Sequence, residues 1–256
     1  MLRIDDRDRV RLVTLDRPER LNAFDRALYR AVTDALSEAA ERSDLAVAVL
    51  TGAGRAFSAG VDLAELVDPR PGPGDDPHPF AGFVDTLASF PKPLLAAVNG
   101  VGVGIGLTLL PYCDLVLIAK GARLRAPFAV LGVAPEAASS YLLPRAMGSQ
   151  RAAHALFTAE WIDAEDAVES GLAWKACEPD ELLDETLAVA RRIAAMPVES
   201  LVETKRLLVA PRLEAVRAAR EREDAAFARL IGTAAQVEAV TAFFEKRPPD
   251  LAEGVG

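Results

Sequence analysis

Apolar residues occur along the chain in two patterns, as short continuous runs and as faces at helical spacing. The runs predict buried strands over residues 10–16, 45–51, 94–98, 115–119 and 172–177. The helical spacing predicts helices over residues 25–42, 80–89, 149–157, 164–170 and 180–195. Asp25 is a residue type that caps a helix N-terminus, and Gly171 is one that ends a helix.

From Glu199 to Lys246 the pattern is wholly helical and strongly charged. Alternating strands and helices followed by such a tail predict an α/β fold with a C-terminal helical module. We place the boundary near Met196, so that residues 1–196 form the core and residues 197–256 form the tail. Proline and glycine are frequent in residues 68–79, which predicts a surface loop there.

Composition narrows the classes of function. The chain has 256 residues, 51% of them hydrophobic, and its net charge of −9 argues against nucleic acid as a partner. We expect no signal peptide and no membrane-spanning segment. Cys113 and Cys177 are too few for a disulfide framework, which favours a cytoplasmic protein. His78 and His154 have no partners at ligand spacing, so we expect neither a metal site nor a Ser-His-Asp triad.

The stretch from Pro91 to Asp114 has the most informative local pattern. A buried strand ends at Asn99, and glycines then occupy positions 100, 102, 104 and 106. A dinucleotide-binding G-x-G-x-x-G is not present, because leucine occupies the position of its third glycine. Two interpretations remain. One is close packing of backbone against backbone, and the other is a junction whose bare amides approach an anionic ligand at a helix N-terminus.

A second glycine-bearing junction covers residues 52–63, after the strand that ends at Thr51. Ser58 does not fit a nucleophile elbow there, since Ala56 stands where that motif has glycine. Further along the chain, Glu136 is an isolated carboxylate among apolar and small residues.

Taken in order, these segments resemble the crotonase (enoyl-CoA hydratase/isomerase) superfamily. The matching segments are LDRPERLNAF (15–24), GRAFSAGVDL (54–63), KPLLAAVNGVGVGIGLTLLPYCD (92–114), APFAVLGVAPEAASSYLLPRAMG (126–148) and FFEKRPP (243–249). The resemblance implies a spiral of ββα turns, a C-terminal helical region used in trimer assembly, and an acyl-CoA thioester substrate. Coenzyme A is then part of the substrate, and no separate cofactor is expected. We expect a homotrimer or a dimer of trimers.

By the same resemblance, the backbone amides of Val61 and Ile105 form an oxyanion hole around the thioester carbonyl. The family more often has glycine at the position of Ile105, but isoleucine is compatible with a role that an amide performs. Removing a proton next to a thioester gives an enolate, and one preorganised donor to its oxygen is typically worth about 10²–10³ in rate.

The positions of the acids separate hydratases from isomerases. Hydratases of this superfamily have two glutamates, where this chain has Thr108 and Phe128, and hydration needs both a base and an acid. Glu136 instead resembles the single glutamate of peroxisomal-type Δ3,Δ2-enoyl-CoA isomerases, with Ala137 and Ala138 replacing the small residues that follow it there. Apolar surroundings should raise its pKa. The resemblance implies that Glu136 moves a proton from C2 to C4. The alternative is a carboxylate that caps the following helix.

The resemblance also implies contacts to the substrate and its coenzyme A. These are Arg20, Leu21, Ala23, Ser58, Ala59, Gly60, Asp62, Leu63, Gly104 and Phe128, with Lys246 and Arg247 as candidates for the 3′-phosphate. For the last two, a solvated charged tail is an equal alternative.

Two other functions stay open. One is hydration or another crotonase-type reaction, with an acid supplied by Glu65, Asp75 or Asp76. The other is a catalytically silent subunit that binds acyl-CoA. Binding without turnover, unaffected by removal of Glu136, would favour the silent subunit.

Overall fold

The computed structural model describes residues 1–62 and 78–250. The strands are β1 (Leu2–Arg7), β2 (Val10–Leu15), β3 (Val47–Gly52), β4 (Ala56–Ser58), β5 (Leu94–Val98), β6 (Val101–Val103), β7 (Leu115–Ala119), β8 (Arg123–Arg125), β9 (Ile162–Asp163) and β10 (Lys175–Cys177). The α-helices are α1 (Arg26–Glu41), α3 (Phe80–Ser89), α4 (Ile105–Thr108), α5 (Ser139–Met147), α6 (Ser149–Thr158), α7 (Ala164–Ser170), α8 (Leu182–Ala194), α9 (Val198–Val209), α10 (Leu213–Leu230) and α11 (Ala234–Glu245). Short 3-10 helices lie at Pro18–Arg20, Leu110–Tyr112 and Ala210–Arg212.

The strands form two sheets, and successive strands divide between them. The larger sheet has the order β1-β2-β3-β5-β7-β10, and the smaller has the order β4-β6-β8-β9. β3, β5 and β7 pair in parallel in the larger sheet, whereas the strand that follows each of them joins the smaller sheet. Each repeat therefore places one strand in each layer and advances the chain by one strand position. This confirms the α/β spiral that the resemblance implied.

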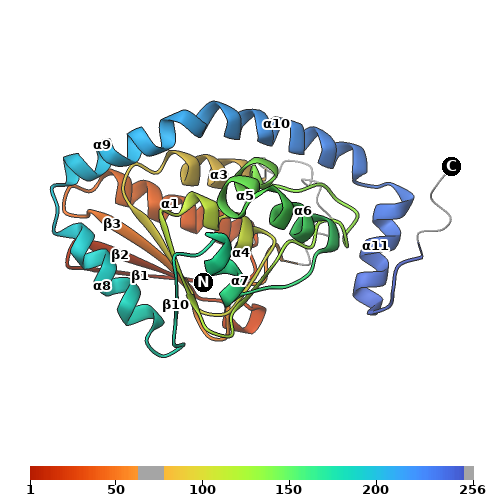
Figure 1. The fold of residues 1–256 in the computed structure, drawn as a ribbon, viewed down its shortest axis with the longest axis horizontal. Coiled ribbons are helices and arrows are strands. Elements are labelled where there is room, and N and C mark those ends of the chain that lie inside the picture. Colours follow the sequence, from red (N-terminus) through yellow and green to blue (C-terminus); the bar gives the residue numbers. More distant parts are fainter. Residues whose placement is uncertain (63–77, 251–256) are drawn as a thin grey trace.

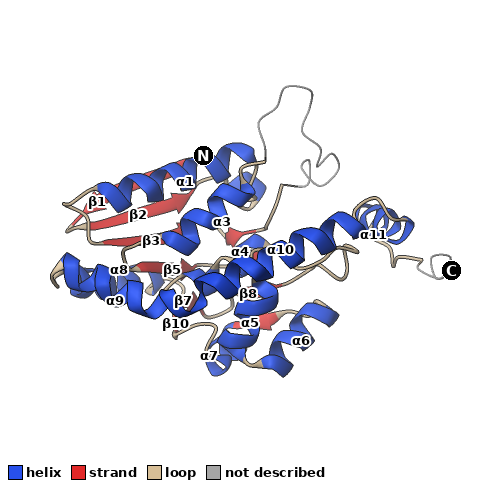
Figure 2. Cartoon of the chain, turned by 90° about the horizontal axis from the view of Figure 1, so that it is seen from above, coloured by secondary structure: helices blue, strands red, loops and turns tan. Residues whose placement is uncertain are grey.

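Helices cover both faces of the larger sheet (Figure 1, Figure 2). Alternate residues of a strand face opposite sides. Ala48 and Leu50 on β3 join the core shared with α1 and α3, and Val47 and Val49 pack with Val189 and its neighbours on α8. Burial on both faces explains why these strands have continuous apolar runs.

Most predicted elements are confirmed. The helices over 80–89 and 164–170 and the strands over 94–98 and 115–119 have the predicted bounds. Asp25 caps α1 by accepting the N–H of Leu28 at 2.8 Å. The last strand is shorter than predicted, because only Lys175–Cys177 pairs with β7. The first strand was not predicted, because its residues are mostly charged and exposed. The strands of the smaller sheet were not predicted, because runs of two or three residues have no readable period.

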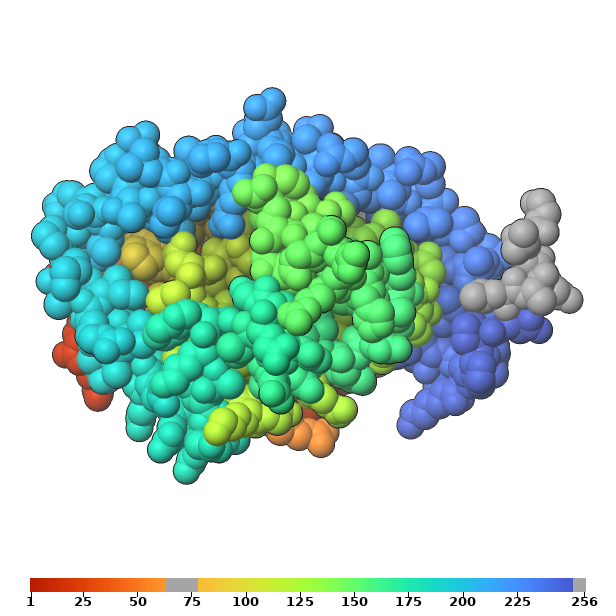
Figure 3. All heavy atoms as spheres, viewed as in Figure 1, coloured from red at the N-terminus to blue at the C-terminus, as the bar shows by residue number. Residues whose placement is uncertain are grey.

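The predicted helical tail is divided into three α-helices. α9 and α10 run along one edge of the molecule, and α11 lies at its far end (Figure 1, Figure 3). α11 packs on the loop before α5, because a Cβ added at Gly132 would lie 2.8 Å from the Cα of Gln236. The boundary at residue 196 and the role of the tail in assembly stay predictions. In the described part of the chain, no helix is long and apolar enough to cross a membrane.

Candidate active site

The two glycine junctions lie directly against each other. A Cβ added at Gly60 would lie 2.8 Å from the carbonyl oxygen of Val103 and 3.9 Å from the Cα of Gly104. Gly60 and Gly104 both have positive φ, +96° and +53°, a region that side chains other than glycine's rarely adopt. The close backbone packing considered for this stretch is therefore present.

Val61 and Ile105 follow these two glycines, and neither N–H has an acceptor among the described residues. Val61 forms a parallel bridge with Phe24, in which the N–H groups of Phe24 and Asp62 donate, each at 2.7 Å. That pattern uses the N–H groups of Phe24 and Asp62, and the N–H of Val61 takes no part in it. Ile105 is the first residue of α4, where an N–H has no partner within the helix. Close packing and available amides thus occur together.

The carboxylate of Glu136 reaches the same junction. A Cβ added at Gly104 would lie 3.9 Å from Glu136 Oε1 and 3.9 Å from the Cα of Gly60. Glu136 is half-buried. Burial, and after it the negative charge of Glu223, raises the pKa of the Glu136 carboxyl to about 8. This is the direction that its apolar surroundings predicted, and it makes the ionised group a stronger base than an ordinary glutamate.

The turn after Glu136 has an unusual backbone. Ala137 and Ala138 both have φ of +56°, the left-handed region that costs a residue with a Cβ about 1–2 kcal/mol. The buried Tyr112 hydroxyl donates to the carbonyl oxygen of Ala137 at 2.7 Å. Glu223 accepts from the N–H of Ala138 at 2.7 Å. Hydrogen bonds from two distant elements therefore hold this turn.

Glu223 also caps α5. Its second oxygen accepts from the N–H of Ser140 at 2.8 Å, whereas Ala138 at the N-cap position has no side chain that could accept. Among the described residues, the side chain that caps α5 is that of Glu223 and not that of Glu136, which does not support the capping alternative for Glu136. The role of Glu223 could not be predicted from the sequence, because nothing distinguishes it from the other acids of a charged helix.

The two residues that the resemblance matches to the hydratase glutamates are buried and uncharged. Thr108 on α4 is fully buried, and its Oγ1 has no hydrogen-bond partner in the described structure. Phe128 is 5% exposed and belongs to the main apolar core. Neither side chain has a carboxyl group that could act as a base or an acid.

The segments expected to contact coenzyme A lie side by side. Ala59 N–H donates to the carbonyl oxygen of Leu21 at 2.9 Å, and Ser58 Oγ donates to that of Asn22 at 2.9 Å. Arg17, which sequence analysis did not single out, ties them together. Its side chain donates to the carbonyl oxygen of Ala23 at 2.6 Å and pairs with Asp62 at 3.1 Å.

The remaining expected contacts have mixed outcomes. Arg20 is exposed. Leu63 lies outside the described residues, and so do residues 68–77 of the predicted loop and the candidate acids Glu65, Asp75 and Asp76. Arg247 is paired with Glu238 and with Glu245. In the described structure, no hydrogen bond or ion pair joins Lys246 or Arg247 to Glu136 or to the glycine junctions.

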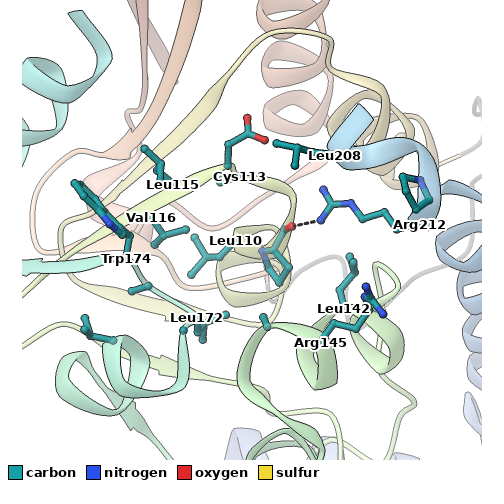
Figure 4. Close-up of a pocket in the computed structure, with 17 residues that line it drawn as sticks. Leu110, Cys113, Leu115, Val116, Leu142, Arg145, Leu172, Trp174, Leu208 and Arg212 are labelled. Atoms are coloured by element: carbon teal, nitrogen blue, oxygen red, sulfur yellow. Dashed lines mark hydrogen bonds between the residues drawn. The ribbon is translucent and has the colours of Figure 1, made fainter. Parts of the chain in front are cut away.

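A separate pocket of about 640 Å³ lies between the 3-10 helix Leu110–Tyr112, α5 and the tail segment from Leu208 to Arg212 (Figure 4). Its lining combines apolar side chains such as Leu110 and Trp174 with Arg145 and Arg212, and Arg212 donates to the carbonyl oxygen of Pro111 at 3.1 Å. Neither Glu136 nor the glycine junctions line it. Within residues 1–62 and 78–250, no cluster of side chains could hold a metal ion.

The spiral fold with a carboxylate at two adjoining glycine turns defines a crotonase-type chain. Over residues 5–254 the chain matches the family model described as enoyl-CoA hydratase/isomerase, and it belongs to that family. It is 34% identical over 249 residues to the 1,2-epoxyphenylacetyl-CoA isomerase of Escherichia coli, a match that covers 94% of each chain. It is 32% identical to the rat enoyl-CoA delta isomerase 2, covering 92% of this chain and 61% of that protein.

Solved structures give the same result. The enoyl-CoA hydratase/isomerase of Pseudoalteromonas atlantica has a TM-score of 0.93 and 37% identity, covering 98% of this chain and 99% of that one. Relatives with hydratase names also match over nearly the whole chain. The family is therefore established, and its members differ in reaction.

Proposed function

We propose that the chain is a Δ3,Δ2-enoyl-CoA isomerase, which converts 3-enoyl-CoA into trans-2-enoyl-CoA. One observation carries the proposal: the carboxylate of Glu136 lies against Gly60 and Gly104, while Thr108 and Phe128 occupy the positions of the hydratase glutamates. Isomerisation needs one carboxyl group, because the proton removed from C2 returns at C4. Hydration needs a base for water and an acid for carbon.

In the proposed reaction, the amides of Val61 and Ile105 bind the thioester oxygen. The Glu136 carboxylate removes a proton from C2, and the electron pair passes into the thioester to form a dienolate. The negative charge collects on the oxygen between the two amides, which stabilise it. Glu136, now a carboxylic acid, delivers the proton to C4, and the double bond moves to C2–C3. Coenzyme A takes part only as a portion of the substrate.

The names of relatives support both this reaction and a second candidate. The rat enoyl-CoA delta isomerase 2 has a name that agrees with this reaction, whereas the Escherichia coli relative is named as the isomerase of an epoxide, 1,2-epoxyphenylacetyl-CoA. Relatives named as hydratases make hydration the second candidate, with Glu65, Asp75 or Asp76 as the additional acid.

The test compares two substrates with one enzyme. With a 3-enoyl-CoA, we expect formation of the conjugated trans-2-enoyl-CoA. With the trans-2 isomer, we expect little 3-hydroxyacyl-CoA, because base catalysis worth about 10²–10⁴ is missing. Hydration as fast as isomerisation would reject the proposal in favour of the second candidate. Acyl-CoA binding with no turnover of either substrate would favour the silent subunit.

We also propose that the tail assembles the chain into a homotrimer or a dimer of trimers. Leu207 and Leu208 on α9 are 67% and 70% exposed, and Phe243 and Phe244 on α11 are each 42% exposed. A monomer of a chain this size seldom leaves so many large apolar side chains exposed along its helical tail. Sedimentation at micromolar concentration that shows only a 27.3 kDa species would contradict assembly.

A further inference from the structure

α10 supplies a residue on which the Glu136 turn depends. We propose that Glu223 is a positioning residue: its carboxylate clamps the turn that follows Glu136 and so aims the Glu136 side chain at Gly104. The inference rests on the proposed function for the role of Glu136, and nothing in the family resemblance assigned a role to Glu223.

The clamp uses both oxygens of one side chain. Oε2 accepts from Ala138 N–H at 2.7 Å and Oε1 accepts from Ser140 N–H at 2.8 Å. Glu223 is only 5% exposed, so solvent competes little for these bonds. Because each oxygen already accepts an amide hydrogen, Glu223 acts by holding the turn and not by exchanging protons with substrate.

The turn needs such a clamp. Ala137 and Ala138 are successive residues in the left-handed region, which alanine populates sparsely. α5 begins immediately after them without a capping side chain of its own. Tyr112 fixes the carbonyl oxygen of Ala137, and Glu223 fixes the amides that follow. A helix that packs from the C-terminal tail thus determines the backbone next to the proposed base.

The clamp also places a charge beside the base. Burial raises the pKa of Glu223, whereas the hydrogen bonds from Ser140 and Ala138 lower it and Asp224 raises it again. Each of those hydrogen bonds stabilises the ionised form of Glu223. Its charge is the further cause that raises the pKa of Glu136. The charges of Arg212, Arg220 and Asp85 influence the pKa of the Tyr112 hydroxyl. Removing the charge of Glu223 should therefore lower the pKa of Glu136.

The experiment compares Glu223→Gln with Glu221→Gln. Both changes remove one negative charge from α10, but Glu221 is exposed. For Glu223→Gln, we expect kcat for 3-enoyl-CoA to fall about tenfold or more with KM within about threefold. The acidic limb of kcat/KM should move down by about half a pH unit or more. Glu221→Gln should change none of these. A ¹³C NMR titration measures the pKa of the Glu136 carboxyl directly. The resonance of this carboxyl is the one that disappears in Glu136→Gln.

The variant Glu223→Asp and the melting temperature of Glu223→Gln provide two further tests. Glu223→Asp retains the charge but is too short to reach both amides. It should keep the pKa of Glu136 near the wild-type value and still lower kcat, and it decides the question if Glu223→Gln does not fold. Wild-type kcat and pH profile in Glu223→Gln would overturn the inference. So would a lower melting temperature with unchanged kcat and an unchanged pH profile, which would leave Glu223 as a helix cap only.

Failure of the proposed function gives a different result. A chain without isomerase activity would still report the pKa of Glu136 in the NMR titration. A pKa that falls in Glu223→Gln and not in Glu221→Gln would then support the clamp while rejecting the reaction. An unchanged pKa would show that Glu223 does not act on Glu136, whatever the reaction.

Discussion

The junction of Gly60 with Gly104 and the turn at Ala137 and Ala138 both use left-handed backbone, but different interactions maintain them. At the junction, glycine takes positive φ without a steric penalty, and neighbouring backbone fills the space where a Cβ would be. At the turn, two alanines carry that penalty. The turn is held by Tyr112 and Glu223, which lie 25 and 85 residues away from their partners in the sequence.

The junction and the turn thus fix the backbone of the candidate active site in two different ways. The junction needs only its own residue types, so its amides are fixed wherever the spiral forms. The turn depends on side chains from other elements, so its geometry exists only when α10 is in place. Substitutions in the junction should therefore act through steric overlap, and substitutions around the turn should act through lost hydrogen bonds.

The largest expected effect comes from the residue that the turn positions. Glu136→Gln keeps the shape of the side chain but cannot accept the C2 proton, so kcat should fall by roughly 10²–10⁴ with KM little changed. Steady-state kinetics with a 3-enoyl-CoA measures both constants. In the wild type, kcat/KM should rise with pH through about 8, because the base must be ionised and its pKa is raised to about 8. Wild-type activity in the variant would place the base elsewhere.

In the junction, Gly60→Ala should disrupt the close packing of the two glycine turns. The added Cβ would meet the Val103 oxygen at 2.8 Å, and φ is +96°. We expect a loss of about 2–4 kcal/mol in the free energy of unfolding, and kcat lower by about 10²–10³ if the Val61 amide moves.

Gly121→Ala is the matched control for Gly60→Ala. Gly121 has φ of +87°, but a Cβ there would have nothing within 4 Å. It therefore carries the backbone strain without the overlap, and we expect wild-type kcat. Urea denaturation and kinetics of both variants measure the difference. Equal effects at the two positions would mean that strain, and not close packing, makes glycine necessary at residue 60.

The backbone of the junction could be predicted from the sequence and that of the turn could not, for a physical reason. Glycines at 60 and 104 mark special backbone in the sequence itself, and the long buried strands have a clear apolar pattern. Ala137 and Ala138 give no local sign of left-handed φ, because long-range hydrogen bonds impose it. Glu223 looks like any acid on an exposed helix, and only the packing of α10 on α5 buries it.

The buried carboxyl should also leave a signature in stability. Because the folded-state pKa of Glu136 is raised to about 8 from the ordinary 4.5, the folded chain binds its proton more tightly than the unfolded chain. That stabilisation is present below pH 4.5 and is lost as the pH rises through about 8. Relative to Glu136→Gln, the wild type should lose about 2–4 kcal/mol between pH 5 and pH 9. Parallel stability curves for the two proteins would contradict the raised pKa.

Tyr112→Phe tests the other support of the turn. The change removes the hydroxyl that donates to the Ala137 carbonyl at 2.7 Å and leaves a buried acceptor unpaired, at a cost of about 1–3 kcal/mol. We expect kcat to fall several-fold, less than for Glu223→Gln, because the two amide bonds to Glu223 remain. Tyr141→Phe is the control, since in the described structure the Tyr141 hydroxyl has no hydrogen bond. Equal loss in both variants would show that Tyr112 does not act through the turn.

The smallest effect is expected at Thr108, the junction residue that replaces a hydratase glutamate. Its hydroxyl is buried without a hydrogen-bond partner among the described residues, and such a group costs about 1–3 kcal/mol. Thr108→Val keeps the branched shape and removes that hydroxyl. The variant should therefore be as stable as the wild type or up to about 1 kcal/mol more stable, with kcat for isomerisation within about twofold. Thermal unfolding and kinetics measure both. A tenfold loss of kcat would mean that the Thr108 hydroxyl contacts the reacting groups, and the catalytic carboxylate would then depend on the junction as well as on the turn.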